Sequence, residues 1–587
     1  MSQTGSGHTN SDGAGGSSPS DWAAHSLEEV RAMLTAPGQP FEMETVEIDG
    51  RPIRAWKNAP ESLRAIAMAA RAHADAVCTV YEGERISYDA WFRAVANLAQ
   101  HLVDCGVTKG DRVALAMRNL PEWPVAFFAI TSLGAICVPL NAWWSAEELA
   151  FGLSDSGSRM LICDKERWDR IGDAARNLDG LEKCIVSRAQ SPLEGASRLE
   201  DIIGSSDAWA GLPDRDLPDV SVAADDDATI FYTSGTTGSP KGALGSHRSI
   251  CTNVLSSKYN LAFAPLRLGE MPPEPEPKTV LLVIPLFHVT ACSAAMVGYL
   301  VSGHTMVFMH HWDVEEAMAV IEREGVQVTG GVPTIAWQLL DHPARDNYDL
   351  SSLELITYGG APAAPELVRR LHEEFGTQPG SGWGMTETMA TVTGHVGQDY
   401  LHRPDSCGPP VAVADLKIMS ADGSEELPTG EVGELYARGP MVAKGYWNRP
   451  DATAETFIDG WVRTGDLARL DEEGFCYIVD RAKDMVIRGG ENIYSSEVEN
   501  VLYAHPAVTD AAVIGLPHQQ LGEEPAAVVH LSKGQNASEE ELQQWVAARL
   551  AHFKVPVRIV FTDEMLPRNA NGKILKKDLR GLFTGAG

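Results

Sequence analysis

The stretch at residues 232–242, YTSGTTGSPKG, follows the short apolar run ATIF and carries three glycines, five Ser or Thr residues and one lysine. Glycines let a backbone approach a ligand closely, and exposed N–H groups in such a turn form an anion-binding nest. A strand that runs into this loop predicts a polyphosphate site, with Lys241 as its cation. A flexible linker is the alternative, but linkers seldom follow a buried strand and carry a single lysine. The loop is not a Walker A motif, because Pro240 precedes the lysine and Gly242 follows it.

The composition narrows the classes of protein that this chain can represent. Its 587 residues are too many for one hydrophobic core. A formal net charge of −32 disfavours nucleic-acid binding, which usually needs a basic surface. The nine cysteines are scattered with no CxxC pair, which favours reduced thiols in a cytoplasmic protein over a zinc site.

Two segments need a decision before the fold is considered. Residues 1–25 are rich in Ser and Gly and lack the basic and apolar regions of a signal peptide, so we interpret them as a disordered tail. Residues 124–140 form the most membrane-like run, which is barely long enough to cross a bilayer. A buried helix that leads into a buried strand explains this run better, and no transmembrane segment is expected.

A large N-terminal domain is predicted over residues 45–480, and from about residue 80 to 480 short apolar strands alternate with helices. Ser87 is a predicted N-cap for the helix over residues 88–102, whose apolar residues keep helical spacing. Strands are predicted at residues 113–117, 279–287, 304–309 and 353–360. This alternation predicts an α/β domain with a largely parallel sheet covered on both faces.

After residue 481 the pattern changes to a small α+β unit, predicted over residues 481–587. A helix is expected to begin at Ser496, with capping-box spacing to Glu499. From Lys554 to Arg580 the chain has seven Lys or Arg residues and three acidic residues. This basic end is either an exposed tail or a surface that meets an anion.

Four further stretches carry polar groups suited to a nucleotide. GWGMTET (382–388) holds Glu387 between two threonines, and such a hard oxygen site suits Mg²⁺. TGDL (464–467) places Asp466 in a predicted turn. DRAKDMVIRGGENIYSSEVE (480–499) lies at the predicted domain boundary, and PRNANGK (567–573) presents Lys573 on a loop rich in Gly and Asn.

With YTSGTTGSPKG, these motifs follow the order found in the adenylate-forming (AMP-binding) superfamily of acyl-CoA synthetases, peptide-synthetase adenylation domains and firefly luciferase. The chain resembles this family over roughly residues 75–583, and it is most similar to medium- and long-chain acyl-CoA synthetases. The resemblance implies a large N-terminal domain of α/β subdomains and a small mobile C-terminal domain. It also implies ATP and coenzyme A as co-substrates and Mg²⁺ as cofactor.

The resemblance assigns the nucleotide contacts residue by residue. Mg²⁺ would bind Glu387, with Thr386 near the α-phosphate. Asp466 and Arg481 would hold the ribose hydroxyls. The β- and γ-phosphates would lie against Thr233, Ser234, Gly235, Thr236, Thr237, Gly238 and Lys241. The adenine would be bordered by Gly360, Ala361, Pro362, Trp383 and Gly384.

The resemblance also implies a two-step mechanism. Lys573 would meet the α-phosphate and the attacking carboxylate, and Lys483 would be the hinge. A carboxylate and ATP are both anions, so catalysis is mainly charge neutralisation and alignment. Attack on the α-phosphate gives an acyl-adenylate and pyrophosphate, and a thiol then displaces AMP. The C-terminal domain would rotate between the two steps.

Coenzyme A is the expected acceptor, because the chain ends soon after the lysine motif and leaves no room for a carrier domain. Gly489 and Gly490 resemble the loop that shapes the pantetheine tunnel in CoA ligases. Lys554 could meet CoA phosphates, although a solvated lysine after a helix is the alternative. Ser496 departs from the Pro of many relatives, with no functional change expected.

The acyl pocket is expected to include His288, Val332, Gly359 and Gly384, with His288 as a wall or gate. No Asp stands near Ala336 and Trp337 to pair with an amino group, so a fatty or aromatic acid is favoured over an amino acid. An acyl-AMP ligase that loads a separate carrier protein, an aryl acid:CoA ligase and a catalytically silent relative stay as alternatives. A homodimer also stays open.

Overall fold

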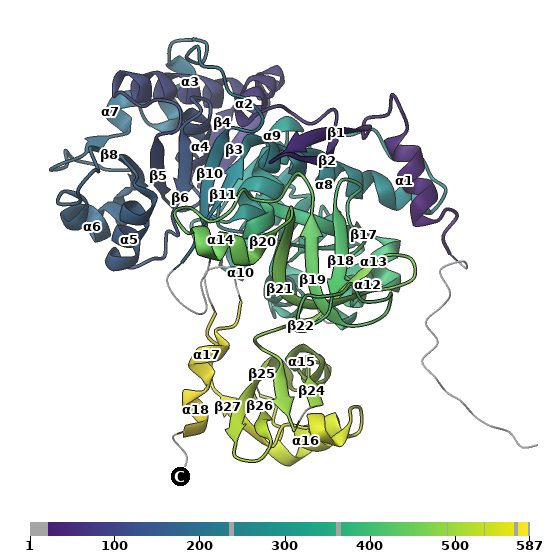
Figure 1. Cartoon of the computed structure of the whole chain (residues 1–587). Helices are drawn as coiled ribbons and strands as arrows, with labels where there is room; N and C mark the ends of the chain where they lie inside the picture. The colour runs from purple at the N-terminus through teal and green to yellow at the C-terminus, as the bar shows by residue number, and fades with distance from the viewer. Residues whose placement is uncertain are drawn as a thin grey trace, which may run out of the picture.

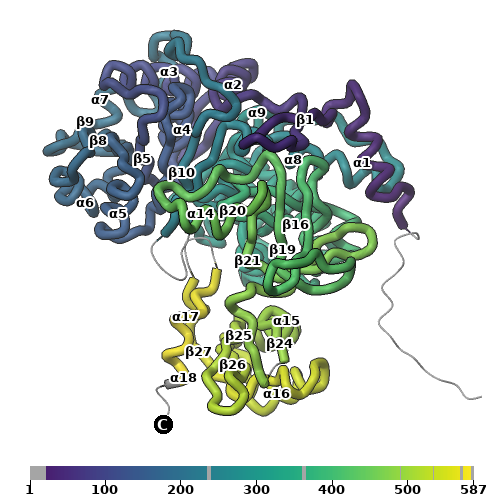
Figure 2. The backbone as a smooth tube through the Cα atoms, viewed as in Figure 1, coloured from purple at the N-terminus to yellow at the C-terminus, as the bar shows by residue number. Residues whose placement is uncertain are grey.

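The computed structural model describes residues 22–233, 240–359, 365–489, 491–532, 534–568 and 573–584. Figure 1 shows a large domain above a small C-terminal domain, drawn in yellow-green and yellow. Figure 2 traces the chain from β21 of the large domain down into the small one. The last strand of the large domain ends at Arg481, and the first strand of the small domain begins at Val486.

A seven-stranded sheet forms one side of the large domain, in the order β11-β10-β6-β5-β7-β8-β9. All neighbours are parallel except β10 and β11, which form an antiparallel pair. Its strands are β5 (Arg112–Ala116), β6 (Ile136–Pro139), β7 (Met160–Asp164), β8 (Lys183–Ser187), β9 (Ser197–Arg198), β10 (Asp227–Tyr232) and β11 (Gly242–Ser246).

An eight-stranded sheet has the order β17-β16-β15-β14-β12-β13-β3-β4. Its inner strands are parallel, and an antiparallel strand closes each edge. The strands are β3 (Val77–Tyr81), β4 (Glu84–Ser87), β12 (Thr279–Leu282), β13 (Thr305–Phe308), β14 (Val328–Gly331), β15 (Leu355–Tyr358), β16 (Gln378–Met385) and β17 (Ala390–Val396).

Helices fill the space between these two sheets and cover their outer faces. The shared core joins β5 and β10 of one sheet to β12 and β13 of the other through α2 (Leu63–Ala70), α3 (Tyr88–Asp104), α4 (Glu122–Thr131), α8 (His247–Arg267) and α9 (Val297–Val301). The outer face of the seven-stranded sheet packs against α5 (Ala146–Ser156) and α6 (Lys165–Ala175). The outer face of the other packs against α10 (Val314–Glu324), α11 (Pro333–Asp341) and α12 (Pro365–Phe375).

The rest of the large domain is β-rich. A five-stranded sheet contains β18 (Asp415–Met419), β19 (Gly433–Arg438), β20 (Phe457–Ile458), β21 (Trp461–Leu470) and β22 (Cys476–Arg481). The hairpin β1 (Met43–Ile48) and β2 (Arg51–Trp56) follows α1 (Leu27–Thr35). The short helices α7 (Glu200–Ile203), α13 (Gln398–His402) and α14 (Pro450–Thr456) lie in the connections.

The C-terminal domain is a five-stranded sheet with helices packed against it, as the α+β prediction required. Its strands are β23 (Val486–Arg488), β24 (Glu491–Ile493), β25 (Val508–His518), β26 (Gly522–Leu531) and β27 (Arg558–Thr562). Its helices are α15 (Ser495–Tyr503), α16 (Glu539–Ala547), α17 (Lys576–Leu579) and α18 (Gly581–Thr584). It has its own hydrophobic core, which suits a unit that can move as one body.

Several local predictions are confirmed. Ser87 caps α3 by accepting a hydrogen bond from the backbone N–H of Ala90. The membrane-like run at residues 124–140 is buried within α4 and β6. In the part of the chain that the structure describes, no helix combines the length and apolar character that a membrane crossing requires.

Other local predictions are wrong. The strand predicted at residues 279–287 ends at Leu282, because the chain then turns into the segment that carries His288. Asp466 lies inside β21 and not in a turn. The parallel strands form two sheets instead of one. Trp22, within the predicted disordered tail, stacks on His402 with ring centroids 4.5 Å apart.

Candidate active site

The carboxyl ends of the parallel strands in the eight-stranded sheet lie at one edge, where ligands of open α/β sheets usually bind. Four predicted site segments follow these strand ends. His288 lies beyond β12, Val332 follows β14, Gly359 follows β15, and Trp383 and Gly384 lie near the end of β16. Topology therefore brings together residues that are far apart in the sequence.

The predicted phosphate loop lies between β10 and β11. Its base is closed, because the Thr233 N–H donates to the Lys241 carbonyl at 2.8 Å and the Lys241 N–H donates to Thr233 Oγ1 at 3.3 Å. The predicted contacts Ser234, Gly235, Thr236, Thr237 and Gly238 lie outside the described residues, as do Gly360, Ala361 and Pro362 of the predicted adenine border. Their roles stay predictions.

Lys241 and Glu387 both contact Tyr446. The Lys241 Nζ is 4.9 Å from the centre of the Tyr446 ring. The Tyr446 hydroxyl donates to Glu387 Oε1 at 2.6 Å. The Glu387 carbonyl also accepts from the Ala443 N–H at 2.8 Å, so one segment holds both the backbone and the side chain of Glu387.

The turn that carries Thr386 and Glu387 has a strained backbone. After the 3₁₀ turn Thr386–Thr388, Met389 and Ala390 have φ angles of 47° and 110°, which residues other than glycine rarely adopt. Asn253 on α8 fixes this turn: its amide donates to the Met389 carbonyl, and its oxygen accepts from the Thr391 N–H, both at 2.9 Å. Backbone strain of this kind persists only where the surroundings enforce it.

Glu387 fits the predicted magnesium site. It is 8% exposed, and burial raises the pKa of its carboxyl group, so a cation near it would relieve an unfavourable buried charge. In the described residues no three His, Cys, Asp or Glu side chains are grouped to cage a metal. Mg²⁺ usually binds through one or two carboxylates together with substrate phosphates, and this requires only Glu387 from the protein.

Trp383, Asp466 and Arg481 form a connected group beside this turn. Adjacent strands pair Asp466 with Arg481, and their side chains are joined by an ion pair of 3.1 Å. The Trp383 indole N–H donates to the other Asp466 oxygen at 2.8 Å. Gly384 is required next to it, because a Cβ there would lie 1.6 Å from the Ala390 carbonyl oxygen. The arrangement offers an aromatic face and a carboxylate to a nucleoside.

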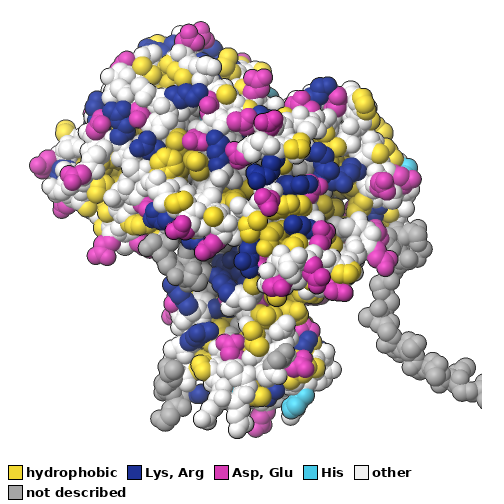
Figure 3. Space-filling view, viewed as in Figure 1, with side chains coloured by type: hydrophobic (Ala, Val, Ile, Leu, Met, Phe, Trp, Pro, Cys, Tyr) yellow, Lys and Arg dark blue, Asp and Glu magenta, His cyan; other side chains and the backbone are white. Residues whose placement is uncertain are grey.

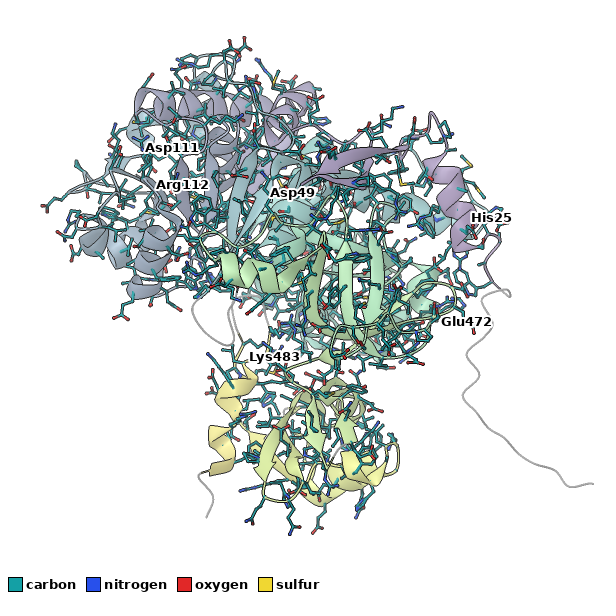
Figure 4. All side chains as sticks on the ribbon, viewed as in Figure 1. His25, Asp49, Asp111, Arg112, Glu472 and Lys483 are labelled. Carbon is teal, nitrogen blue, oxygen red and sulfur yellow. The ribbon has the colours of Figure 1, made fainter. Side chains whose placement is uncertain are left out.

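Lys573 of the C-terminal domain approaches the Asp466–Arg481 pair. Burial, followed by the positive charge of Arg481, lowers the pKa of Lys573 to about 8, and Asp466 also acts on it in the opposite direction. Burial and Arg481 likewise lower the pKa of Lys483, which Figure 4 labels at the junction of the two domains. Dark-blue Lys and Arg side chains gather in the notch between the domains in Figure 3. The domains therefore bring cations from both sides to one place.

The segment that carries Lys573 is anchored at both ends. On one side, Arg568 forms a 2.7 Å ion pair with Asp510, a fully buried carboxylate that also accepts from the Tyr503 hydroxyl at 2.7 Å. On the other side, Lys576 forms a 2.7 Å ion pair with Glu499. These contacts tie residues on both sides of Lys573 to the body of the C-terminal domain.

The capping box predicted at Ser496 is wrong. Helix α15 begins at Ser495, and the Ser495 hydroxyl donates to Asp480 of the large domain at 3.0 Å. The Ser496 hydroxyl donates to the Val479 carbonyl. Glu499 accepts from the Val513 N–H at 2.7 Å instead of capping its own helix. A tertiary contact across the domain boundary has replaced the local one.

The pKa of Lys573 predicts a pH dependence. The cationic form of Lys573 predominates below about pH 8, so kcat/KM for ATP in the first half-reaction should fall as the pH rises through this value. Pyrophosphate release without CoA, measured across this range, tests the prediction. The variant Lys573→Arg should abolish the fall, because arginine stays charged. A wild-type profile that is flat through pH 8 would contradict the assignment.

The predicted acyl-pocket residues lie at the same sheet edge. His288 is partly buried, and burial lowers its pKa to about 4, so the ring is neutral near pH 7. Val332 precedes α11 as its N-cap residue. The Gly359 N–H donates to the Gly331 carbonyl at 3.1 Å, which holds the ends of β14 and β15 together. These walls are apolar or neutral.

The predicted CoA contacts lie in the C-terminal domain. Gly489 has a φ of 60° and donates to the Leu521 carbonyl at 2.7 Å. Gly490 lies outside the described residues. Lys554 forms a 2.6 Å ion pair with Glu497, so in this arrangement its charge is compensated within the domain. The CoA role of these residues stays a prediction.

A family model described as AMP-binding enzyme matches residues 66–447, and one described as AMP-binding enzyme C-terminal domain matches residues 497–573. The chain belongs to the AMP-binding enzyme family. The prediction of an adenylate-forming enzyme with a large and a small domain is thereby confirmed.

This AMP-binding enzyme aligns with its relatives over nearly their whole length. It is 36% identical to feruloyl-CoA synthase of Amycolatopsis sp over 518 residues, which is 88% of this chain and 97% of the relative. It is 35% identical to the long-chain-fatty-acid–CoA ligase FadD13 of Mycobacterium tuberculosis over 503 residues, with coverages of 85% and 93%. The structure of an anthranilate CoA ligase with anthranoyl-AMP matches at 26% identity and a TM-score of 0.79, covering 89% and 97%.

Sequence reasoning missed three parts of the site. Tyr446 is 59 residues from Glu387, and Asn253 lies within an ordinary helix, so no local motif joins either to the carboxylate turn. The Asp510 anchor is 58 residues from Arg568. The residue types were the only indication in the sequence, since a buried Tyr or Asp needs a hydrogen-bond partner.

Proposed function

We propose that this AMP-binding enzyme is an ATP-dependent carboxylic acid:CoA ligase that acts on an apolar acid, aliphatic or aromatic. The observation that carries the proposal is the convergence of Glu387, the Asp466–Arg481 pair and Lys573 of the second domain at one sheet edge. This convergence places cations and a metal-binding carboxylate where two anions, the acid and ATP, must react. The names of the relatives support the choice of CoA ligation.

In the first step the carboxylate oxygen of the acid attacks the α-phosphorus of ATP, and the bond to the β-phosphate oxygen breaks. An acyl-adenylate and pyrophosphate result. Lys573 orients the carboxylate and neutralises charge at the α-phosphate, while Lys241 neutralises the β- and γ-phosphates. Glu387 would hold Mg²⁺, which would supply further charge neutralisation. Trp383 and Asp466 hold the nucleoside in position, so orientation is fixed before reaction.

In the second step the CoA thiol, as its proton leaves, attacks the acyl carbonyl carbon, and AMP departs. The products are acyl-CoA and AMP. No protein nucleophile is required. Rotation of the C-terminal domain about Lys483 is proposed to remove Lys573 and admit the thiol, with Gly489, Gly490 and Lys554 facing CoA. That rotation would break the Ser495–Asp480 hydrogen bond.

An apolar acid is favoured by the chemistry of the proposed pocket. His288 is neutral near pH 7, and Val332 and Gly359 offer no charge. The pocket segment at residues 332–340, VPTIAWQLL, contains no carboxylate that could bind an α-amino group. An amino acid would therefore bring an unpaired ammonium group into an apolar site, which is costly.

The function is tested by incubating the protein with MgATP, CoA and a panel of medium-chain, long-chain, cinnamic-type and amino acids. We expect AMP, pyrophosphate and acyl-CoA in equal amounts with at least one fatty or aromatic acid. ADP as product would contradict the mechanism. Adenylate formation without CoA turnover would support the alternative of an acyl-AMP ligase that loads a carrier protein, and an amino acid as best substrate would overturn the acid class.

Location and assembly stay predictions. All nine cysteines are free thiols, which agrees with a cytoplasmic protein. A homodimer can be tested by measuring the molar mass in solution.

A further inference from the structure

Tyr446 contacts both of the residues that are predicted to neutralise phosphate charge, Glu387 through Mg²⁺ and Lys241 directly. Its hydroxyl donates to Glu387 Oε1 at 2.6 Å, and its ring face lies 4.9 Å from Lys241 Nζ. Both partners come from other segments: Lys241 closes the phosphate loop and Glu387 lies in the turn after β16. One side chain therefore touches the predicted metal ligand and the predicted phosphate cation.

The backbone of Tyr446 is fixed to the strand that leaves the phosphate loop. Ala243 and Tyr446 form an antiparallel bridge. The Trp447 N–H donates to the Gly242 carbonyl at 2.7 Å, and the Leu244 N–H donates to the Gly445 carbonyl at 2.9 Å. Residues 444–447 thus extend the edge of β11 next to Lys241. Any displacement of this segment would move the base of the phosphate loop with it.

The ring of Tyr446 is also locked from the other side. It is 9% exposed and packs edge-on against Phe457, with ring centroids 5.5 Å apart. The Tyr446 N–H donates to Thr453 Oγ1 of α14 at 2.9 Å. A side chain held in this way has one orientation, so its hydroxyl can act as a fixed donor.

The geometry separates two opposite charges that would otherwise attract each other. In the part of the chain that the structure describes, no ion pair of 4.0 Å or less joins Lys241 to Glu387; each contacts Tyr446 instead, the lysine at the ring face and the glutamate at the hydroxyl group. A direct Lys–Glu pair would have to be broken before phosphate and metal could bind. A neutral donor to one carboxylate oxygen and an aromatic face under the ammonium group hold both charges without cancelling them.

We propose that Tyr446 is a positioning residue that keeps Glu387 oriented for Mg²⁺ and Lys241 oriented for the ATP phosphates, while preventing the two from pairing. This inference rests on the proposed function, because it presumes MgATP as a substrate. In this proposal the Tyr446 hydroxyl orients the metal ligand Glu387, and the Tyr446 ring orients Lys241. Substitutions can therefore separate the two contributions.

The test uses the full chain and measures ATP binding by tryptophan fluorescence, once in EDTA and once over a range of MgCl₂ concentrations. Tyr446→Phe keeps the ring and removes the hydroxyl. It should raise the Mg²⁺ concentration for half-maximal tightening of ATP binding about tenfold, the effect of one hydrogen bond to a charged group. ATP binding in EDTA should stay within about twofold of wild type, because the ring under Lys241 remains.

Tyr446→Leu removes the ring as well and should weaken ATP binding in EDTA about fivefold, in addition to the magnesium effect. Tyr477→Phe is the matched control, because it removes a tyrosine–carboxylate hydrogen bond of 3.0 Å to Asp471, a residue with no assigned role in the site. The control should leave the magnesium dependence unchanged. If Tyr446→Leu fails to fold, Tyr446→Phe carries the test.

The magnesium dependence of ATP binding distinguishes the proposed role of Tyr446 from a purely structural one. A lower melting temperature of Tyr446→Phe with a wild-type magnesium dependence would overturn the proposal. Failure of the proposed function has another signature: the wild-type protein would bind MgATP but form no acyl-CoA from any acid. In that case the magnesium dependence of Tyr446→Phe would still decide the role of Tyr446.

Discussion

Lys573→Ala is expected to lower the rate of acyl-adenylate formation from acid and MgATP about a thousandfold, the scale found when a charge-stabilising group is removed from a transition state. The cation of Lys573 neutralises charge where the carboxylate meets the α-phosphate, and no other cation from the C-terminal domain is assigned to that place. The pyrophosphate released in the presence of the acid measures this half-reaction.

The second half-reaction should respond differently. Thioester formation from supplied acyl-adenylate and CoA should fall by less than about tenfold in Lys573→Ala, because the leaving AMP no longer depends on this cation. Lys577→Ala is the matched control, since Lys577 is an exposed lysine on the helix that follows and has no role assigned. Equal losses in both half-reactions would refute the role given to Lys573.

Glu387→Gln is the second substitution with a large expected effect, a loss of about a hundredfold to a thousandfold in adenylate formation. The amide keeps the shape of the side chain and can accept the hydrogen bond from the Tyr446 hydroxyl. What it loses is the negative charge that binds Mg²⁺. Stopped assays of pyrophosphate release over a range of MgCl₂ concentrations measure the effect.

Stability provides the internal control for this substitution. Burial raises the pKa of the Glu387 carboxyl group, so the charged form is costly in the free protein. Glu387→Gln removes that cost and should keep or raise the melting temperature while activity falls. If Glu387→Gln does not fold, Glu387→Asp provides the test. It keeps the negative charge on a side chain that is one methylene shorter, and it should retain partial activity at high Mg²⁺ concentration. Wild-type activity of Glu387→Gln would exclude Glu387 as the metal ligand.

The motifs could be recognised in the sequence because each contains the residue types that the chemistry needs within a short stretch of chain. Glycine and hydroxyl residues before Lys241 describe a phosphate loop without any knowledge of the fold. Alternating apolar runs predicted β5, β12, β13 and β15 because buried parallel strands are apolar on both faces. The predicted strand over residues 279–287 was too long, because an apolar run alone does not show where the chain leaves the sheet.

The predictions that failed depended on contacts between distant segments. Asp466 was assigned to a turn from Thr-Gly-Asp, yet the pairing of β21 with β22 places it opposite Arg481. Ser496 has capping-box spacing to Glu499, but the Ser496 hydroxyl donates to the Val479 carbonyl and Glu499 forms an ion pair with Lys576. Local spacing yields to a stronger charged partner when folding brings one near.

The sequence by itself determined the family, the order of the domains and the chemical character of the phosphate loop, the carboxylate turn and the lysine of the C-terminal domain. These follow from residue type and spacing, which are properties of the unfolded chain. Only the tertiary structure decided that Tyr446 contacts both Lys241 and Glu387, that Asn253 fixes the strained turn and that Asp510 anchors the lysine segment. The physical reason is that buried polar groups must find partners, and which partners are within reach depends on how the strands cross and pair, not on their distance along the chain.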